Sequence, residues 1–234
     1  MKFSDIPFPD APDGSRDPEL WMLLTQYEFV RWLPDDWPDE YREITSRLKQ
    51  KTDRLTAAAL DESEPLFRSR AACFLMALWR ESRLDLILKF LDDEHEFVRE
   101  QVARHLVSIR HPQLEGRLVE LATLDAAADV RCAGCRGLGG QEPLSVIPTL
   151  IHILDQDHES GENGWSVSSC AADALDEMLG TEWMARRQEG VCSLPEGSPN
   201  PAAVREQALF YLQELQERQP DEKNSDRQSD SETD

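Results

Sequence analysis

The motif with the clearest chemical potential is a pair of cysteines three residues apart, Cys132 and Cys135. A CxxC pair acts as a redox dithiol in a strand-to-helix context, and as half of a zinc site where a second pair exists. The sequence has no second CxxC, and this one lies within a stretch whose apolar residues have helical spacing. We therefore interpret both thiols as structural.

The segment from Asp155 to Glu162 places carboxylates at alternate positions, as calcium-binding loops do. Such loops also need glycine at the sixth position and glutamate at the twelfth, where this chain has Ser160 and Ser166. No nucleophile elbow, phosphate-binding glycine loop or HExxH motif stands in a suitable context. The sequence thus predicts no catalytic residue, no cofactor and no metal ion.

The chain is strongly acidic, with 25 Lys and Arg against 46 Asp and Glu in 234 residues and a net charge of −21. Binding to nucleic acid or to an anionic membrane depends on basic side chains, so the charge argues against both classes of partner. Seven acidic and three basic residues lie between Glu217 and Asp234, so −17 remains on the rest of the chain. A basic protein surface is the partner that this charge favours.

The five cysteines are odd in number and lie in or beside apolar helical stretches, which is untypical of a disulfide framework. The N-terminus lacks an apolar signal region, and the longest apolar run, from Ala71 to Trp79, has nine residues where a membrane span needs about twenty. These features predict reduced thiols and a cytoplasmic protein.

An internal period organises the middle of the chain. Five apolar anchor positions are separated by 31, 32, 37 and 37 residues; they are Phe67, Val98, Val130, Val167 and Val204. Small or apolar residues mostly follow each anchor by four and five positions, and a leucine follows each by eight. This spacing marks one buried face of a helix.

A second amphipathic segment precedes each of the three middle anchors, with apolar residues at intervals of three, four and seven. Proline stands where a first helical turn tolerates it, at Pro65, Pro112, Pro143 and Pro201. Alternation of β-branched residues, typical of strands, is absent. The sequence predicts an all-α protein in which each unit is a helix pair.

The repeated segments Asp93-x4-Val98-Arg99 and Asp125-x4-Val130-Arg131, each continuing to a leucine, resemble the HEAT-like repeat family. The similarity is to the short repeat found in phycobilin lyases and deoxyhypusine hydroxylase. It implies an α-solenoid, an α-α superhelix of four to five helix pairs of the armadillo-like kind. It covers about residues 66–179, with a weaker unit at 201–215.

In that family the aspartate and the arginine six residues later form a ladder between repeats. The pairs with this spacing are Asp93 with Arg99, Asp125 with Arg131 and, with Glu in place of Asp, Glu62 with Arg68. The fourth unit has Ser168 where the arginine is expected, and its loop is longer.

Deoxyhypusine hydroxylase holds iron with His-Glu pairs that follow the anchor directly, but the two His-Glu dipeptides here, at His95 and His158, precede their anchors. We expect these dipeptides to be solvated turn residues.

The predicted organisation has six parts. They are an extended segment at 1–16, an N-terminal helical cap with the first-repeat helix at 17–65, the HEAT-like core at 66–189, a loop at 190–200, a C-terminal helix at 201–218 and a disordered acidic tail at 219–234. Within the cap we expect one helix from Asp17 to Trp32 and a long one from Pro38 to Leu60. The aromatic residues Trp21, Trp32, Trp37 and Tyr41 are expected to cover the open end of the first repeat.

Three residues are candidates for partner binding. Arg104 and Arg136 share the position six residues after the anchor, which predicts a short basic stripe; pairing with local carboxylates such as Glu100 is the alternative. Trp165 ends the longer fourth loop, and insertions of this kind often decorate a binding edge. The register also predicts that Cys135 is buried and Cys132 exposed.

The leading functional hypothesis is a non-enzymatic scaffold or adaptor that binds another protein, since stacked helix pairs typically present such surfaces. A basic partner of the kind that an immunity protein neutralises is a sharper form of this hypothesis. The alternative is an enzyme or enzyme subunit resembling a phycobilin lyase, which rests on the family similarity alone.

Overall fold

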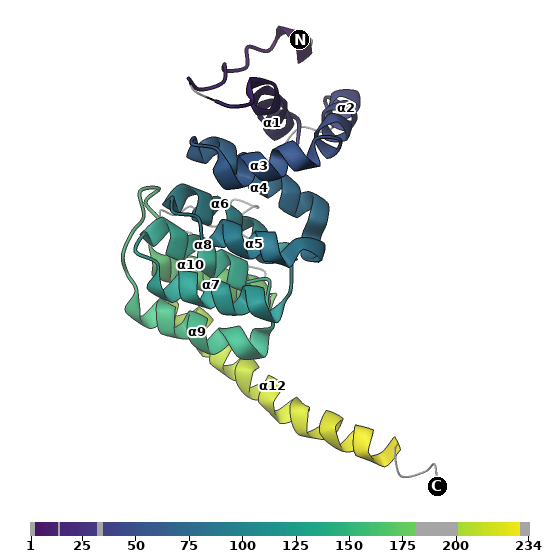
Figure 1. Ribbon diagram of the computed structural model, residues 1–234. Helices are drawn as coiled ribbons and strands as arrows, with labels where there is room; N and C mark the ends of the chain where they lie inside the picture. The colour runs from purple at the N-terminus through teal and green to yellow at the C-terminus, as the bar shows by residue number, and fades with distance from the viewer. Residues whose placement is uncertain (1–2, 14, 32–34, 181–200, 230–234) are drawn as a thin grey trace. The chain divides into compact units, whose positions relative to one another are not determined.

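The computed structural model describes residues 3–13, 15–31, 35–180 and 201–229. The chain, coloured from its N-terminus to its C-terminus in Figure 1, divides into two compact units, Met1–His105 and Leu106–Asp234. Every regular element in the described ranges is a helix, and one isolated antiparallel bridge joins Ser160 to Ser166. The all-α prediction is therefore confirmed.

The first unit has six α-helices among its described residues. Their bounds are α1 Pro18–Val30, α2 Pro38–Lys49, α3 Thr52–Asp61, α4 Pro65–Trp79, α5 Leu84–Leu91 and α6 Glu96–His105. Helix α1 packs on α2 and α4, while α4 also packs on α3 and α6. The Asp17 carboxylate caps α1 by accepting the Leu20 N–H at 3.0 Å, as the sequence predicts for an aspartate before a first-turn proline.

The second unit has five α-helices in the described residues. Their bounds are α7 Pro112–Leu124, α8 Ala128–Leu138, α9 Pro143–Gln156, α10 Val167–Leu179 and α12 Pro201–Ser229. Helix α8 packs on α7 and α10, and α9 packs on α10 and α12. The prolines predicted to begin helices do so: Pro65, Pro112, Pro143 and Pro201 are the first residues of α4, α7, α9 and α12.

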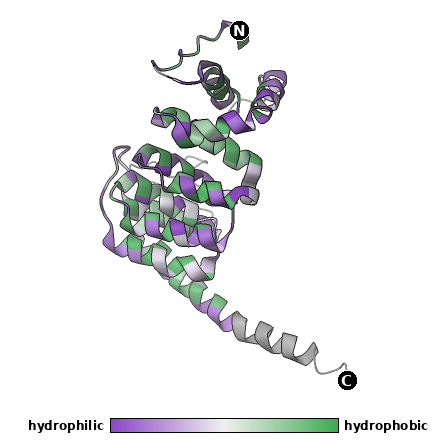
Figure 2. Cartoon of the chain, viewed as in Figure 1, coloured by the Kyte–Doolittle hydropathy of each residue, from purple (hydrophilic) through white to green (hydrophobic). Residues whose placement is uncertain are grey.

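The expectation of one long helix from Pro38 to Leu60 is wrong. The helix ends at Lys49: the Gln50 N–H still makes the helical bond to Ser46 O at 3.2 Å, but the Lys51 N–H bonds to Leu48 O at 2.9 Å, only three residues back. The largely hydrophilic α2 (purple in Figure 2) then packs on α1, whereas α3 packs on α4. The break lets each segment bury its own apolar side against a different neighbour.

The periodic positions read from the sequence are buried. The five anchors are at most 2% exposed, and Ala71, Val102, Ala171 and Ala208, each four positions after an anchor, are 0% exposed. Five positions after the anchor, Leu209 in the last repeat is the exception, at 42% exposed. The 3.6-residue period thus identifies the core-facing side of α4, α6, α8 and α10.

One glycine in this series permits a close helix contact. A Cβ at Gly134 on α8 would lie 2.8 Å from the backbone nitrogen of Ala122 on α7. Glycine allows the two backbones to approach where a side chain would clash.

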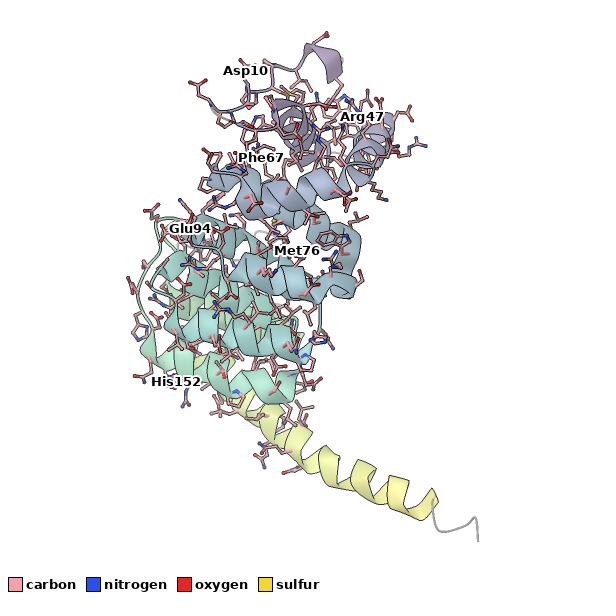
Figure 3. All side chains as sticks on the ribbon, viewed as in Figure 1. Asp10, Arg47, Phe67, Met76, Glu94 and His152 are labelled. Carbon is pink, nitrogen blue, oxygen red and sulfur yellow. The ribbon has the colours of Figure 1, made fainter. Side chains whose placement is uncertain are left out.

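The aromatic residues near the N-terminus pack within the first unit. Trp21 lies edge-on to Phe67 with ring centroids 5.5 Å apart, and Trp37 lies 5.2 Å from Phe29. Tyr41 stacks on Tyr27. Figure 3 shows Phe67 inside the packed helices of this unit. Trp32 lies outside the described residues.

The C-terminal region differs from the sequence-based expectation. The structure continues α12 as helix to Ser229, across most of the segment 219–234 expected to be disordered. Residues 230–234, the expected loop at 190–200 and the end of the core at 181–189 lie outside the described residues.

Candidate functional site

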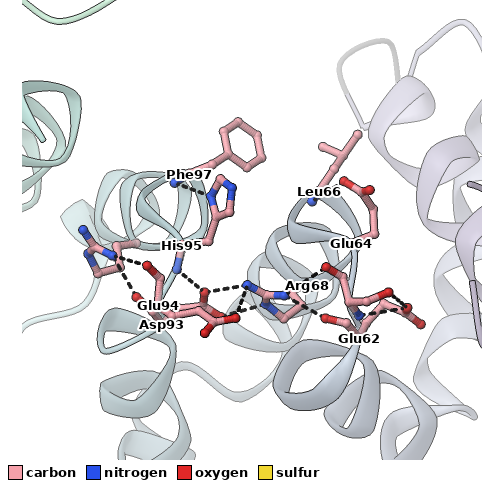
Figure 4. Close-up of polar contacts among 10 residues, drawn as sticks. Glu62, Glu64, Leu66, Arg68, Asp93, Glu94, His95 and Phe97 are labelled. Atoms are coloured by element: carbon pink, nitrogen blue, oxygen red, sulfur yellow. Dashed lines mark hydrogen bonds and ion pairs between the residues drawn. The ribbon is translucent and has the colours of Figure 1, made fainter.

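Arg68 is the centre of the polar site in the first unit. It lies in the first turn of α4, 5% exposed, and six residues after Glu62. Its Nε and Nη2 donate to the two oxygens of Asp93 at 2.9 and 2.8 Å, and its Nη1 donates to the backbone carbonyl of Glu62 at 2.8 Å (Figure 4). One guanidinium therefore joins the α3–α4 turn to the α5–α6 turn.

Arg131 repeats this arrangement in the second unit. Its Nη1 donates to the Asp125 carbonyl at 2.9 Å, its Nε to the Asp157 carboxylate at 2.7 Å, and its Nη2 to Glu159 at 2.5 Å. Pairing with these carboxylates raises the pKa of Arg131, as pairing with Asp93 raises that of Arg68.

These contacts define how the four ladder residues predicted from the sequence lie. Arg99 and Arg131 reach the residue six positions earlier through its backbone carbonyl, at 2.8 Å for Asp93 and 2.9 Å for Asp125. The carboxylate partner lies instead 25 residues after Arg68 and 26 after Arg131. The Asp125 carboxylate accepts the Ala127 N–H at 3.0 Å.

Sequence reasoning considered Asp157 only as one of the alternating carboxylates of the loop at 155–162, so it missed the pairing of Asp157 with an arginine. The carboxylates of that loop bind arginines: Asp155 accepts from Arg205 at 2.9 and 3.1 Å, and Asp157 accepts from Arg131. The constant forward spacing from arginine to aspartate was the signal that could have found it. Among the described residues, no group of three or more His, Cys, Asp or Glu is placed to hold a metal ion.

A pocket of about 510 Å³ opens beside the Arg68–Asp93 pair. It is formed by the end of α3, the turn to α4 and the α5–α6 turn; the lining residues are Ala59, Leu60, Asp61, Glu62, Ser63, Arg68, Lys89, Phe90, Asp93 and Glu94. Four are acidic and two basic, which gives the lining a net formal charge of −2. The volume falls within the range of about 300–1,000 Å³ typical of ligand sites.

The acidic residues of the pocket differ sharply in exposure. Glu62 is 3% exposed, and its carboxylate accepts the Arg16 N–H at 3.2 Å and the Ser63 N–H at 3.0 Å. By contrast, the Glu94 side chain is 92% exposed and extends from the α5–α6 turn (Figure 3). The pocket therefore has a buried carboxylate in its wall and an exposed one at its edge.

The three residues predicted to bind a partner lie in different surroundings. Arg104 pairs with Glu100 one turn earlier on α6, as the alternative for this residue anticipates. Arg136 is half-buried on α8, and Trp165 is half-buried with its carbonyl accepting the Gly161 N–H at 3.0 Å. Arg104 belongs to the first unit and Arg136 to the second, so the basic stripe stays a prediction.

The CxxC cysteines are both buried, so the expectation that Cys132 is exposed is wrong. Cys132 is 3% exposed because the long loop before α10 covers it, and its thiol donates to the Trp165 carbonyl at 3.8 Å. A hydrogen bond with Cys170 and burial raise the pKa of Cys132, and burial raises that of Cys135. Both thiols are therefore held in the unreactive protonated form.

A cysteine and a histidine distant in sequence meet in the first unit. The Sγ atom of Cys73 lies 3.5 Å from Nδ1 of His105, a pairing seen in cysteine nucleophiles. However, Nδ1 lies 2.7 Å from the Gln101 carbonyl and Nε2 faces the Arg31 guanidinium at 3.5 Å. The histidine thus donates from Nδ1 and accepts at Nε2, which leaves no base for the thiol.

Burial acts on both members of this pair. It lowers the pKa of His105 and raises that of Cys73 to about 12. A neutral imidazole beside a protonated thiol is a packing arrangement. The pair could not be predicted from local spacing, because the two residues lie 32 positions apart on different helices.

Of the two His-Glu dipeptides, His158-Glu159 lies in the loop before α10, whereas His95-Glu96 spans the start of α6, which begins at Glu96. His95 precedes α6 and accepts the Phe97 N–H through Nδ1 at 3.2 Å (Figure 4), while Glu159 binds Arg131. His158 is exposed. His152 points away from α9 (Figure 3).

Comparison with known proteins gives no relative on which to base a function: no family model and no curated protein sequence matches the chain. Within the described residues, no helix combines the length and apolar character that crossing a membrane requires.

Proposed function

We propose that this protein is a non-enzymatic adaptor of the HEAT-like helical-repeat type, whose helix pairs form an α-solenoid and present an acidic surface to a basic protein. The repeat assignment is supported by the buried anchor positions and by the same arginine link in both units. In each case a buried arginine joins a carbonyl six residues earlier to a carboxylate 25 or 26 residues later.

The excess of negative charge is the observation that supports a basic protein as the partner. Met1–His105 contains 22 acidic and 15 basic residues, and Leu106–Asp234 contains 24 and 10, so the two units carry −7 and −14. Several arginines are engaged by local carboxylates, as Arg54 is by Asp17 and Glu19. Exposed acids such as Asp53 and Asp61 remain for an external cation, and complementary charge accelerates association.

The test is binding of the purified full-length chain to candidate partners captured by cross-linking at low salt. We expect captured proteins to be predominantly basic and the association rate constant to fall at least about tenfold between roughly 50 and 500 mM salt. An association rate that does not change with salt would contradict a basic partner. Recovery of no protein, together with a large thermal shift caused by a small molecule, would contradict the adaptor function.

A further inference from the structure

The pocket beside Arg68 contains a buried negative charge that the described residues do not neutralise. Asp93 is paired with Arg68 through two hydrogen bonds, so these two charges compensate each other. Glu62, 3% exposed, forms no ion pair with any described residue, and its hydrogen-bond partners are the Arg16 and Ser63 N–H groups and the Ser63 hydroxyl. A buried carboxylate without a cation is unfavourable, and a cation entering the pocket would relieve that cost.

Glu62 also retains capacity to accept another hydrogen bond. An ionised carboxylate offers about four acceptor positions, and three contacts to Glu62 are present. Asp61 is exposed at the end of α3, and Glu94 is exposed at the opposite turn. The pocket lining thus includes one buried and two exposed carboxylates besides Asp93, and Lys89 is its cation other than Arg68. The Glu94 carboxylate lies 3.9 Å from the Arg68 guanidinium but stays 92% exposed, so it is accessible to a further cation.

Apart from Ser63, the remaining lining is apolar. Leu60 on α3 is 39% exposed, and Phe90 on α5 also lines the pocket. A long basic side chain combines an aliphatic stem with a charged end, so it matches a pocket with both kinds of lining. Guanidinium suits several carboxylates better than ammonium does, because its five N–H donors are arranged in a planar fork.

From this geometry we propose that the pocket lined by Asp61, Glu62 and Glu94 is the subsite that receives an arginine side chain of the basic partner. The inference rests on the proposed function, since it names the group that such a partner inserts. The guanidinium binds Glu62 at the pocket wall and Asp61 or Glu94 at its edge, while the stem lies against Leu60 and Phe90.

The direct test is a titration of the ¹⁵N-labelled full-length chain with N-acetyl-arginine amide, at about 20 mM salt to limit screening. N-acetyl-citrulline amide is the matched neutral probe, and free arginine distinguishes a peptide side chain from the amino acid. We expect the arginine amide to shift the amide signals of 60–63 and 89–94 in a saturable manner, and citrulline to cause no shift. Equal shifts from citrulline, or binding of free arginine alone, would overturn the proposal.

Variants test the carboxylates. Asp61→Asn and Glu94→Gln together should weaken binding of the arginine amide about tenfold, which corresponds to about 1.4 kcal/mol. Glu62→Gln should do the same. Asp53→Asn is the matched control, because Asp53 is exposed on the same helix α3 and does not line the pocket. Loss of affinity in the control equal to that in the pocket variants would overturn the proposal.

The outcome separates this inference from the proposed function. If a basic protein binds the pocket variants as it binds the original chain, with the same salt dependence, the pocket is not the subsite and the adaptor function stands. If no basic protein binds in a salt-dependent manner, the proposed function itself fails. Circular dichroism of each variant checks that helix content is retained, and a folded variant with unchanged affinity counts against the pocket.

Discussion

Replacing Arg68 by leucine removes the guanidinium that joins the two turns. The Arg68 and Asp93 side chains are 7% and 11% exposed, so the variant leaves a nearly buried carboxylate without its cation. It also leaves the Glu62 carbonyl without a hydrogen bond that measures 2.8 Å. Breaking a buried ion pair by removing one partner costs about 3–5 kcal/mol, so we expect a loss of that size in the free energy of unfolding.

A surface pair on the same unit provides the control. Arg42 and Asp39 form an ion pair of 2.6 Å, but their side chains are 73% and 87% exposed. Exposed pairs contribute about 0–1 kcal/mol, so Arg42→Leu should have little effect. The variant Arg68→Leu/Asp93→Leu removes both charges and should be more stable than the sum of the single losses predicts, because neither ion is left unpaired.

The assay is urea unfolding followed by circular dichroism, with hydrogen exchange of α4 and the α5–α6 turn to locate the change. We expect the urea midpoint of the first unit to fall for Arg68→Leu, with exchange accelerated in both segments. If Arg68→Leu lowers the stability no more than Arg42→Leu does, the reasoning from burial is refuted.

Two further predictions follow from packing and burial. Gly134→Ala should destabilise the second unit by about 1–3 kcal/mol in urea unfolding, because the new Cβ would lie 2.8 Å from the Ala122 backbone nitrogen. Gly116→Ala is the control: its Cβ would have nothing within 4 Å, so the change should be neutral or stabilising. An equal effect of both changes would refute the packing argument. Burial, with Asp173 nearby, raises the pKa of Asp176 to about 6, so its contribution to stability is complete below pH 4 and lost as pH rises through 6. Asp176→Asn should therefore increase the free energy of unfolding at pH 7.5 by about 1–2 kcal/mol, which raises the melting temperature, and should have much less effect at pH 4. The same gain at both pH values would contradict the raised pKa of Asp176.

The helices and their buried sides were largely predictable from the sequence, because the 3.6-residue period directly encodes which side of a helix is apolar. Phe67, Val98 and Val130 are buried as that period requires. Leu209 departs from it at 42% exposed, since α12 packs on α9 and α10 and the side that carries Leu209 faces away from them. A period identifies an apolar side, but burial also requires a neighbour to cover it.

Contacts across turns were less predictable. The spacing of six residues between Glu62 and Arg68 is visible in the sequence, yet it corresponds to a contact with a backbone carbonyl, while the carboxylate comes from Asp93 in another turn. Such contacts depend on how helices pack, which local spacing does not determine. Cys132 shows the same limit. Its burial comes from a loop that is longer than the corresponding loops of the other sequence repeats, so comparing the repeats could not predict it.

The arginine links have a direction along the chain. Arg68 and Arg131 each reach forward to a carboxylate 25 or 26 residues nearer the C-terminus. During synthesis, each arginine therefore leaves the ribosome before the aspartate that neutralises it. The ion pair can form only after the turn that carries this aspartate has emerged. The two directions of truncation are unequal for the same reason. A C-terminal truncation between Arg131 and Asp157 leaves the Arg131 guanidinium without this carboxylate. An N-terminal truncation that removes Arg131 leaves Asp157, whose carboxylate still accepts the Glu159 N–H at 3.2 Å.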